Sequence, residues 1–215
     1  MGRFGPVQPC PFDRLKIGQY IRGFKISVNV SWDTVDNVII PVNVSESFHW
    51  ILVVFCISQR CLFVYDSLLG GVVHTKNVVD HVQSLATMLP LFLVATDFFG
   101  KEMILTGSES SHTLISLFAD PLGYVIVRNT PQQRADSNDC GLYTCALVEY
   151  VSHSVFDVSN INFYAINHRL RYAALLWDYA RIKQNDCAIS DSEATENVTS
   201  RFGGPNICKE AVSNV

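Results

Sequence analysis

The sequence lacks an excess of positive charge. It contains 16 Lys and Arg residues against 20 Asp and Glu residues, so its formal net charge at pH 7 is −4. Proteins that bind nucleic acid generally neutralise phosphates with basic side chains, and no such surplus is available here. The composition therefore predicts that nucleic acid is not a partner.

The sequence also lacks a segment that would carry it into a membrane. The N-terminal residues MGRFGPVQPCPF contain no apolar stretch as long as a signal peptide needs, and Pro6 stands where a myristoylation signal requires Ser or Thr. The longest apolar runs, at 50–57 and 89–95, are far shorter than the ~18 residues of a transmembrane helix. We therefore expect a soluble protein of the nucleus or cytoplasm without a membrane partner.

The seven cysteines lack the spacing of a metal site. The sequence has neither a CxxC pair nor the Cys/His spacing of a zinc site. An odd, irregularly spaced set without an export signal is typical of reduced thiols inside the cell. We therefore expect neither a disulfide framework nor a bound metal.

Hydrophobic residues make up 48% of the 215 residues, which is enough for one sizeable core. Residues 1–30 are mixed in character and are treated as a lead-in. Residues 31–184 carry the periodic apolar patterns of a single folded domain. Residues 185–215 are polar and rich in Ser, Asn and Glu, which predicts a disordered tail.

Within that domain, patterns of period two and period 3.6 predict the following elements. The predicted strands are 38–42, with Pro41 near a strand end or at a sheet edge, then 49–57, 61–67 and 124–127. The predicted helices are 76–89, with Pro90 at or beyond its end, 140–151 and 163–183. The run HWILVVFCI is almost continuously apolar, which is typical of a strand buried on both faces.

Cys140 stands where the polar loop of 130–139 meets the helical pattern of 140–151. The first turn of a helix carries free backbone N–H groups and the positive end of the helix dipole, which stabilise a thiolate relative to a thiol. A single cysteine is nevertheless most often an ordinary core residue. Partner residues elsewhere in the sequence must decide between these two interpretations.

The predicted hairpin of strands 49–57 and 61–67 supplies two such partners. If its loop has an even number of residues centred near Ser58 and Gln59, His49 lies opposite Leu68 and diagonal to Asp66. Both side chains then share a face, with Cα atoms about 7–8 Å apart. The carboxylate would fix one imidazole nitrogen and leave the other as a base. An odd loop would place the two side chains on opposite faces.

The motifs HW before an apolar strand, then VYDS, then PQQ, then DCG opening a helix, follow one another in this order. This series resembles the catalytic core of the ubiquitin-like-protein-specific proteases, the SUMO-processing cysteine proteases. The resemblance implies a papain-like α+β fold in which a central mixed or antiparallel sheet is flanked by helices. The cysteine protease catalytic domain would then occupy residues 31–184.

The resemblance also implies a role for individual residues. Cys140 would be the nucleophile, His49 the general base and acid, and Asp66 the residue that orients His49. Gln133, rather than its neighbour Gln132, would donate its side-chain amide to the oxyanion alongside the backbone N–H of Cys140. No metal or organic cofactor is implied.

The implied substrate is the C-terminal Gly-Gly of a ubiquitin-like modifier, with SUMO and its conjugates as partners of a monomeric enzyme. Trp50 would line the channel that admits the two glycines. Only 48 residues precede His49, so the tryptophan that forms the other wall in the family is absent, and we interpret the chain as N-terminally truncated. The segment from Gln133 to Cys140 is also one residue longer than in the best-known members.

These departures leave two alternatives open. The first is a truncated, inactive homologue that acts as a binding module. A protease for another modifier or for a polyprotein is the other alternative.

Overall fold

The computed structural model describes residues 19, 21–22, 30–45, 48–98 and 118–185. The chain forms two compact units, Met1–Phe163 and Tyr164–Val215. The boundaries predicted for the folded domain, 31 and 184, stay a prediction. The predicted lead-in lies largely outside the described residues, as does the predicted tail from residue 186 onward.

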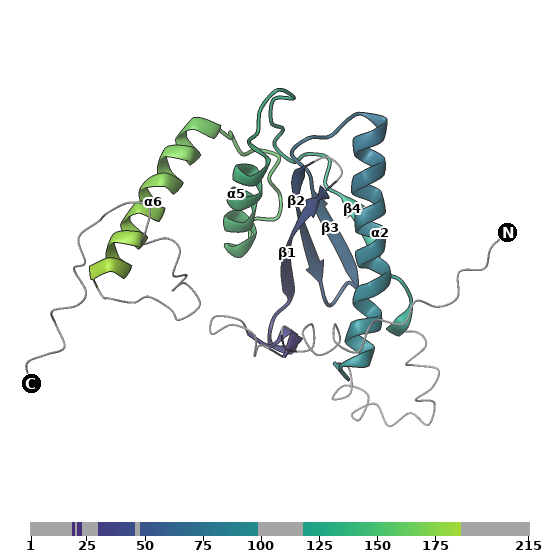
Figure 1. Cartoon of the computed structure of the whole chain (residues 1–215). Coiled ribbons are helices and arrows are strands. Elements are labelled where there is room, and N and C mark those ends of the chain that lie inside the picture. The colour runs from purple at the N-terminus through teal and green to yellow at the C-terminus, as the bar shows by residue number, and fades with distance from the viewer. Residues whose placement is uncertain (1–18, 20, 23–29, 46–47, 99–117, 186–215) are drawn as a thin grey trace, which may run out of the picture. The chain divides into compact units, whose positions relative to one another are not determined.

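The first unit is built on a mixed sheet with strand order β1-β2-β3-β4 (Figure 1). Its strands are β1 (Asn37–Val44), β2 (His49–Cys56), β3 (Cys61–Tyr65) and β4 (Gly123–Ile126). The first three pair antiparallel, and β4 pairs parallel with β3. Pro41 lies on β1, an edge strand, as its missing N–H predicts. The expected α+β fold with a mixed sheet is confirmed.

Strand β2 is buried on both faces, as its continuous apolar run predicts. Ile51, Val53 and Phe55 belong to a core cluster with helix α2 (Val72–Ala95). Leu52 and Val54 belong to a second cluster with helix α5 (Cys140–Ser152). The two helices therefore cover opposite faces of the sheet (Figure 1).

The prediction that Pro90 ends the helix is wrong, because α2 continues through Pro90 to Ala95. Proline has no N–H, so the carbonyl of Ala86, four residues earlier, has no helical partner. The backbone N–H of Leu122, immediately before β4, donates to that carbonyl at 2.9 Å. A contact with a distant segment thus satisfies the group that the proline leaves free.

Helix α2 is also long and apolar enough to cross a membrane by length and composition alone, as are many core helices of water-soluble proteins. Its inward side packs against the sheet through a set of buried side chains. These are Val78, Val82, Ala86, Leu89, Phe92 and Leu93. The packing accounts for its apolar character, since it supplies a large part of the core.

The second unit contains helix α6 (Ala165–Asn185), which matches the helix predicted over 163–183 to within two residues at each end. Such end shifts are within the usual spread of helix assignments.

Candidate active site

The hairpin of β2 and β3 has the register that an even loop predicts. Cys56 pairs with Cys61 and Leu52 pairs with Tyr65, so residues 57–60 form the loop. Arg60 adopts a positive φ of 50° within this turn. The register places His49 and the residue that follows β3, Asp66, near the same end of the sheet.

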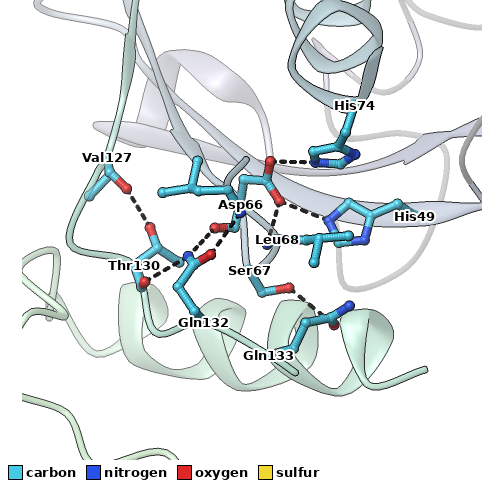
Figure 2. Close-up of polar contacts among 10 residues, drawn as sticks. His49, Asp66, Ser67, Leu68, His74, Val127, Thr130, Gln132 and Gln133 are labelled. Atoms are coloured by element: carbon cyan, nitrogen blue, oxygen red, sulfur yellow. Dashed lines mark hydrogen bonds and ion pairs between the residues drawn. The ribbon is translucent and has the colours of Figure 1, made fainter. Parts of the chain in front are cut away.

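His49 and Asp66 meet at that end (Figure 2). Nε2 of His49 lies 2.8 Å from Oδ1 of Asp66, and the two residues are only 3% and 2% exposed. The predicted contact between histidine and acid is therefore confirmed. Because Nε2 faces the carboxylate, Nδ1 is the ring nitrogen that remains for proton exchange with another group.

Asp66 accepts two further hydrogen bonds. The backbone N–H of Leu68 donates to Oδ1 at 2.9 Å, and Nε2 of His74 lies 2.9 Å from Oδ2. Burial alone would raise the pKa of Asp66, but the hydrogen bonds from His49, Leu68 and His74 outweigh it and hold the pKa below its usual value. Asp66 is therefore an anion at neutral pH.

His74 is the residue of this cluster that sequence reasoning missed. It lies near the start of α2, and no motif distinguishes it from other helical histidines. The chain reaches this position through Gly70 and Gly71, whose φ angles of 126° and 77° are readily adopted only by glycine. The Gly-Gly pair that follows the acid at the end of the strand is the signal in the sequence that could have indicated this turn.

His49, Asp66 and His74 each offer an atom of the kind that binds metals, and these atoms lie within 4.8 Å of one another. Both imidazole Nε2 atoms, however, stand at hydrogen-bond distance from carboxylate oxygens. A proton on each Nε2 explains these distances, and a protonated nitrogen has no lone pair for a metal. We therefore assign the cluster to hydrogen bonding.

Gln132 fixes the loop before α5 to the segment that carries Asp66 (Figure 2). Its side-chain amide donates to the carbonyls of Asp66 and Thr130, both at 2.9 Å, and its Oε1 accepts from the backbone N–H of Leu69 at 2.7 Å. The hydroxyl of Tyr143 on α5 donates to the Gln132 carbonyl. Because these bonds occupy both N–H groups of the Gln132 amide, it has no donor left for a substrate.

Gln133 is held differently. Its backbone N–H donates to the carbonyl of Ser67 at 2.8 Å, and its Oε1 accepts from the Ser67 hydroxyl at 3.5 Å. Among the described residues its side-chain NH₂ makes no hydrogen bond, so it keeps two donors for another molecule. The arrangement agrees with the preference for Gln133 over Gln132 as an oxyanion donor, and that role stays a prediction.

Cys140 is the first residue of α5, as predicted, and is a half-buried free thiol. Asp139 is the N-cap residue, but its side chain makes no capping hydrogen bond. Among the described residues no hydrogen bond joins Cys140 to His49. The structure therefore brings His49, Asp66 and the Gln133 backbone together, while the complete triad stays a prediction.

Trp50 follows His49 on β2 and, since side chains alternate along a strand, faces the opposite side of the sheet. It is 41% exposed, although the rest of the strand from Ile51 onward is buried. Phe48, just before His49, is 89% exposed. The two aromatic residues that flank His49 in the sequence are therefore exposed. The role of Trp50 in a channel stays a prediction.

We compared the sequence with models of known protein families. The model of the Ulp1 protease family, C-terminal catalytic domain, matches residues 11–185. No match is found among curated proteins.

Solved structures also match. The SUMO protease Ulp1 with its catalytic cysteine oxidised to a sulfonic acid is 18% identical, with a TM-score of 0.43 over 73% of this chain and 57% of that one. The Ulp1 domain in complex with Smt3, the yeast orthologue of SUMO, is 18% identical (TM-score 0.39; 66% and 50%). The Chlamydia trachomatis effector Cdu1 bound to ubiquitin is 18% identical (TM-score 0.34; 84% and 60%). The chain thus spans between 50% and 60% of the length of these structures.

Proposed function

The chain belongs to the Ulp1 protease family, and on that premise we propose that it is a cysteine peptidase. Its proposed substrate is the bond after the C-terminal Gly-Gly of a ubiquitin-like modifier, SUMO in the first place. The observation that carries the proposal is the buried pair of His49 and Asp66, because it leaves Nδ1 of His49 for proton transfer. SUMO is chosen because of the order of the HW, VYDS, PQQ and DCG motifs.

In the proposed reaction Nδ1 of His49 takes the proton of the Cys140 thiol, and the resulting thiolate attacks the carbonyl carbon of the last glycine. The oxyanion accepts hydrogen bonds from the Cys140 backbone N–H and the Gln133 amide. His49 gives a proton to the leaving lysine amine, so the C–N bond breaks and a thioester remains. Water, deprotonated by His49, then attacks the thioester and releases the modifier with a free carboxylate and the Cys140 thiol.

We further propose that the protein acts as a monomer in a reducing compartment, the nucleus or the cytoplasm. The cysteine pattern supports the compartment, because seven irregularly spaced cysteines without the spacing of a zinc site are typical of reduced thiols inside the cell.

Electrophilic probes test the function directly. SUMO, ubiquitin and NEDD8 carrying a C-terminal electrophile in place of the final carboxylate are each incubated with the intact protein, and the product is measured by intact mass and peptide mapping. We expect one adduct, on Cys140, formed fastest with the SUMO probe. A faster reaction with another probe would replace SUMO by that modifier, and the lack of an adduct with all three would refute the peptidase function.

A binding module without catalysis is the second candidate. The observation that favours it is that no hydrogen bond joins Cys140 to His49 among the described residues. Binding of unmodified SUMO by calorimetry, together with no adduct from any probe, would support this function instead.

Gln133 gives a separate prediction. Gln133→Ala is expected to lower kcat by roughly 10²–10³-fold with little change in KM, because an oxyanion donor acts on the transition state more than on the bound substrate. Steady-state kinetics on a SUMO–Gly-Gly amide substrate measure this effect. Arg134→Ala is the matched control, since its exposed side chain pairs with Asp136. An equal, small effect of both variants would remove Gln133 from the oxyanion site.

A further inference from the structure

His74 is connected to both members of the His49 and Asp66 pair (Figure 2). Its Nε2 lies 2.9 Å from Oδ2 of Asp66, the oxygen that neither His49 nor Leu68 contacts. Its ring also packs edge to face against the ring of His49, with centroids 4.9 Å apart and planes at 84°. One side chain from α2 therefore restrains the carboxylate and the imidazole together.

The surroundings of His74 define its protonation state. Its Nδ1 is buried and has no hydrogen-bond partner among the described residues. A charged imidazolium would carry a proton on that nitrogen and would bury an unsatisfied donor, which is unfavourable. A neutral His74 with its proton on Nε2 avoids this cost and donates a hydrogen bond to Asp66.

The contacts of Asp66 also determine which ring nitrogen of His49 is protonated. With Leu68 and His74 donating to different oxygens, the Asp66 carboxylate cannot rotate without breaking a hydrogen bond in a buried site. Its Oδ1 consequently stays directed at Nε2 of His49, which must be the protonated nitrogen. Nδ1 of His49 then carries the lone pair that a general base requires.

We propose that His74 is a positioning residue for the reaction: it locks the Asp66 carboxylate and packs against His49, so that His49 keeps the tautomer with a basic Nδ1. The inference rests on the proposed peptidase function. The anchoring of His74 supports it, because α2 packs into the core a turn further on through Val78 and Val82. A histidine on a core helix holds the carboxylate more rigidly than one on a loop would.

Kinetics of three variants test this role. His74→Leu removes the donor and is expected to lower kcat on a SUMO–Gly-Gly amide by about 10–100-fold, the effect usual for a residue that orients a catalytic group, with KM changed less than about twofold. His74→Gln retains an N–H that can reach Oδ2 and is expected to recover most of that loss. His81→Gln, on the same helix but bonded to the Asn77 carbonyl, is the control and should match the wild type.

A second measurement does not depend on activity. Two-bond ¹H–¹⁵N spectra of Cys140→Ala protein report the tautomer of each histidine, and we expect both His49 and His74 to be neutral and protonated on Nε2. In His74→Leu protein the His49 signals should show the second tautomer as well. An Nδ1-protonated or charged His74, or a His49 tautomer unaffected by His74→Leu, would overturn the inference even if the enzyme is active.

The two experiments separate this inference from the proposed function. If the protein cleaves no modifier but the spectra show the expected tautomers, the peptidase function is wrong while the restraint of His49 by His74 is supported. If the protein is active and His74→Leu is fully active, the function is supported and the role of His74 is refuted.

Discussion

Cys140→Ala protein is expected to lose at least about 10⁴-fold in kcat on a SUMO–Gly-Gly substrate while binding SUMO as tightly as the wild type. Loss of the nucleophile removes the covalent route and leaves only binding and oxyanion stabilisation. The substitution should not disturb the fold. Cys140 is half-buried at the first position of α5, and alanine is a strong helix former. Kinetics measure the turnover, and calorimetry with SUMO measures the affinity.

Cys145 provides the matched control. It is a free thiol on the same helix and is exposed, so an electrophile in solution can reach it. Cys145→Ala should retain wild-type turnover and should still form the adduct with the SUMO probe. Turnover of Cys140→Ala above about 1% of wild type would contradict the nucleophile role, and loss of SUMO binding in this variant would mean that Cys140 does more than attack the carbonyl.

The hairpin and the pair of His49 and Asp66 could be predicted because they depend on local information. The continuous apolar run of β2 identifies a strand buried on both faces, and an even loop then defines the register. Leu52 opposite Tyr65 is the register so predicted. From that register the meeting of His49 and Asp66 follows without knowledge of the rest of the fold.

The two features that could not be predicted depend on contacts between distant segments. Helix α2 passes through Pro90 because Leu122 supplies a hydrogen bond to Ala86 from beyond the helix. His74 reaches Asp66 because Gly70 and Gly71 turn the chain at positive φ and α2 then packs on the sheet. Local propensity gives no information on either contact. Tertiary packing therefore overrides the local prediction at Pro90 and at His74.

The adjacent glutamines show where residue type alone reaches its limit. Gln132 and Gln133 have the same chemistry and differ only in what surrounds them. The Gln132 amide bonds to backbone groups of Asp66, Thr130 and Leu69, whereas the Gln133 amide donors stay available. The sequence ranked the two only through a family resemblance, and the hydrogen bonds give a physical reason for that ranking.

His49→Gln protein is expected to lose roughly 10⁴-fold in kcat without a large loss of stability. The glutamine amide can donate to Oδ1 of Asp66 as Nε2 of His49 does at 2.8 Å, so the buried carboxylate keeps its partner. No group replaces Nδ1, so nothing can take the proton of Cys140 or give one to the leaving amine. Kinetics on the SUMO–Gly-Gly substrate and urea unfolding measure the two quantities separately.

His49→Leu distinguishes catalysis from structure at this position. Leucine removes the base and also leaves Asp66, which is 2% exposed, without one of its donors. We expect an activity loss as large as that of His49→Gln, together with a free energy of unfolding lower by about 2 kcal/mol, the usual cost of removing a hydrogen bond to a charged group. If His49→Gln retained activity within about tenfold of the wild type, His49 would be a structural partner of Asp66 rather than the base. If both variants were inactive and equally unstable, the activity loss would reflect the fold. The alkylation rate of Cys140 by iodoacetamide in folded His49→Gln protein would then show whether His49 acts as the base of Cys140. A thiol without its base reacts more slowly.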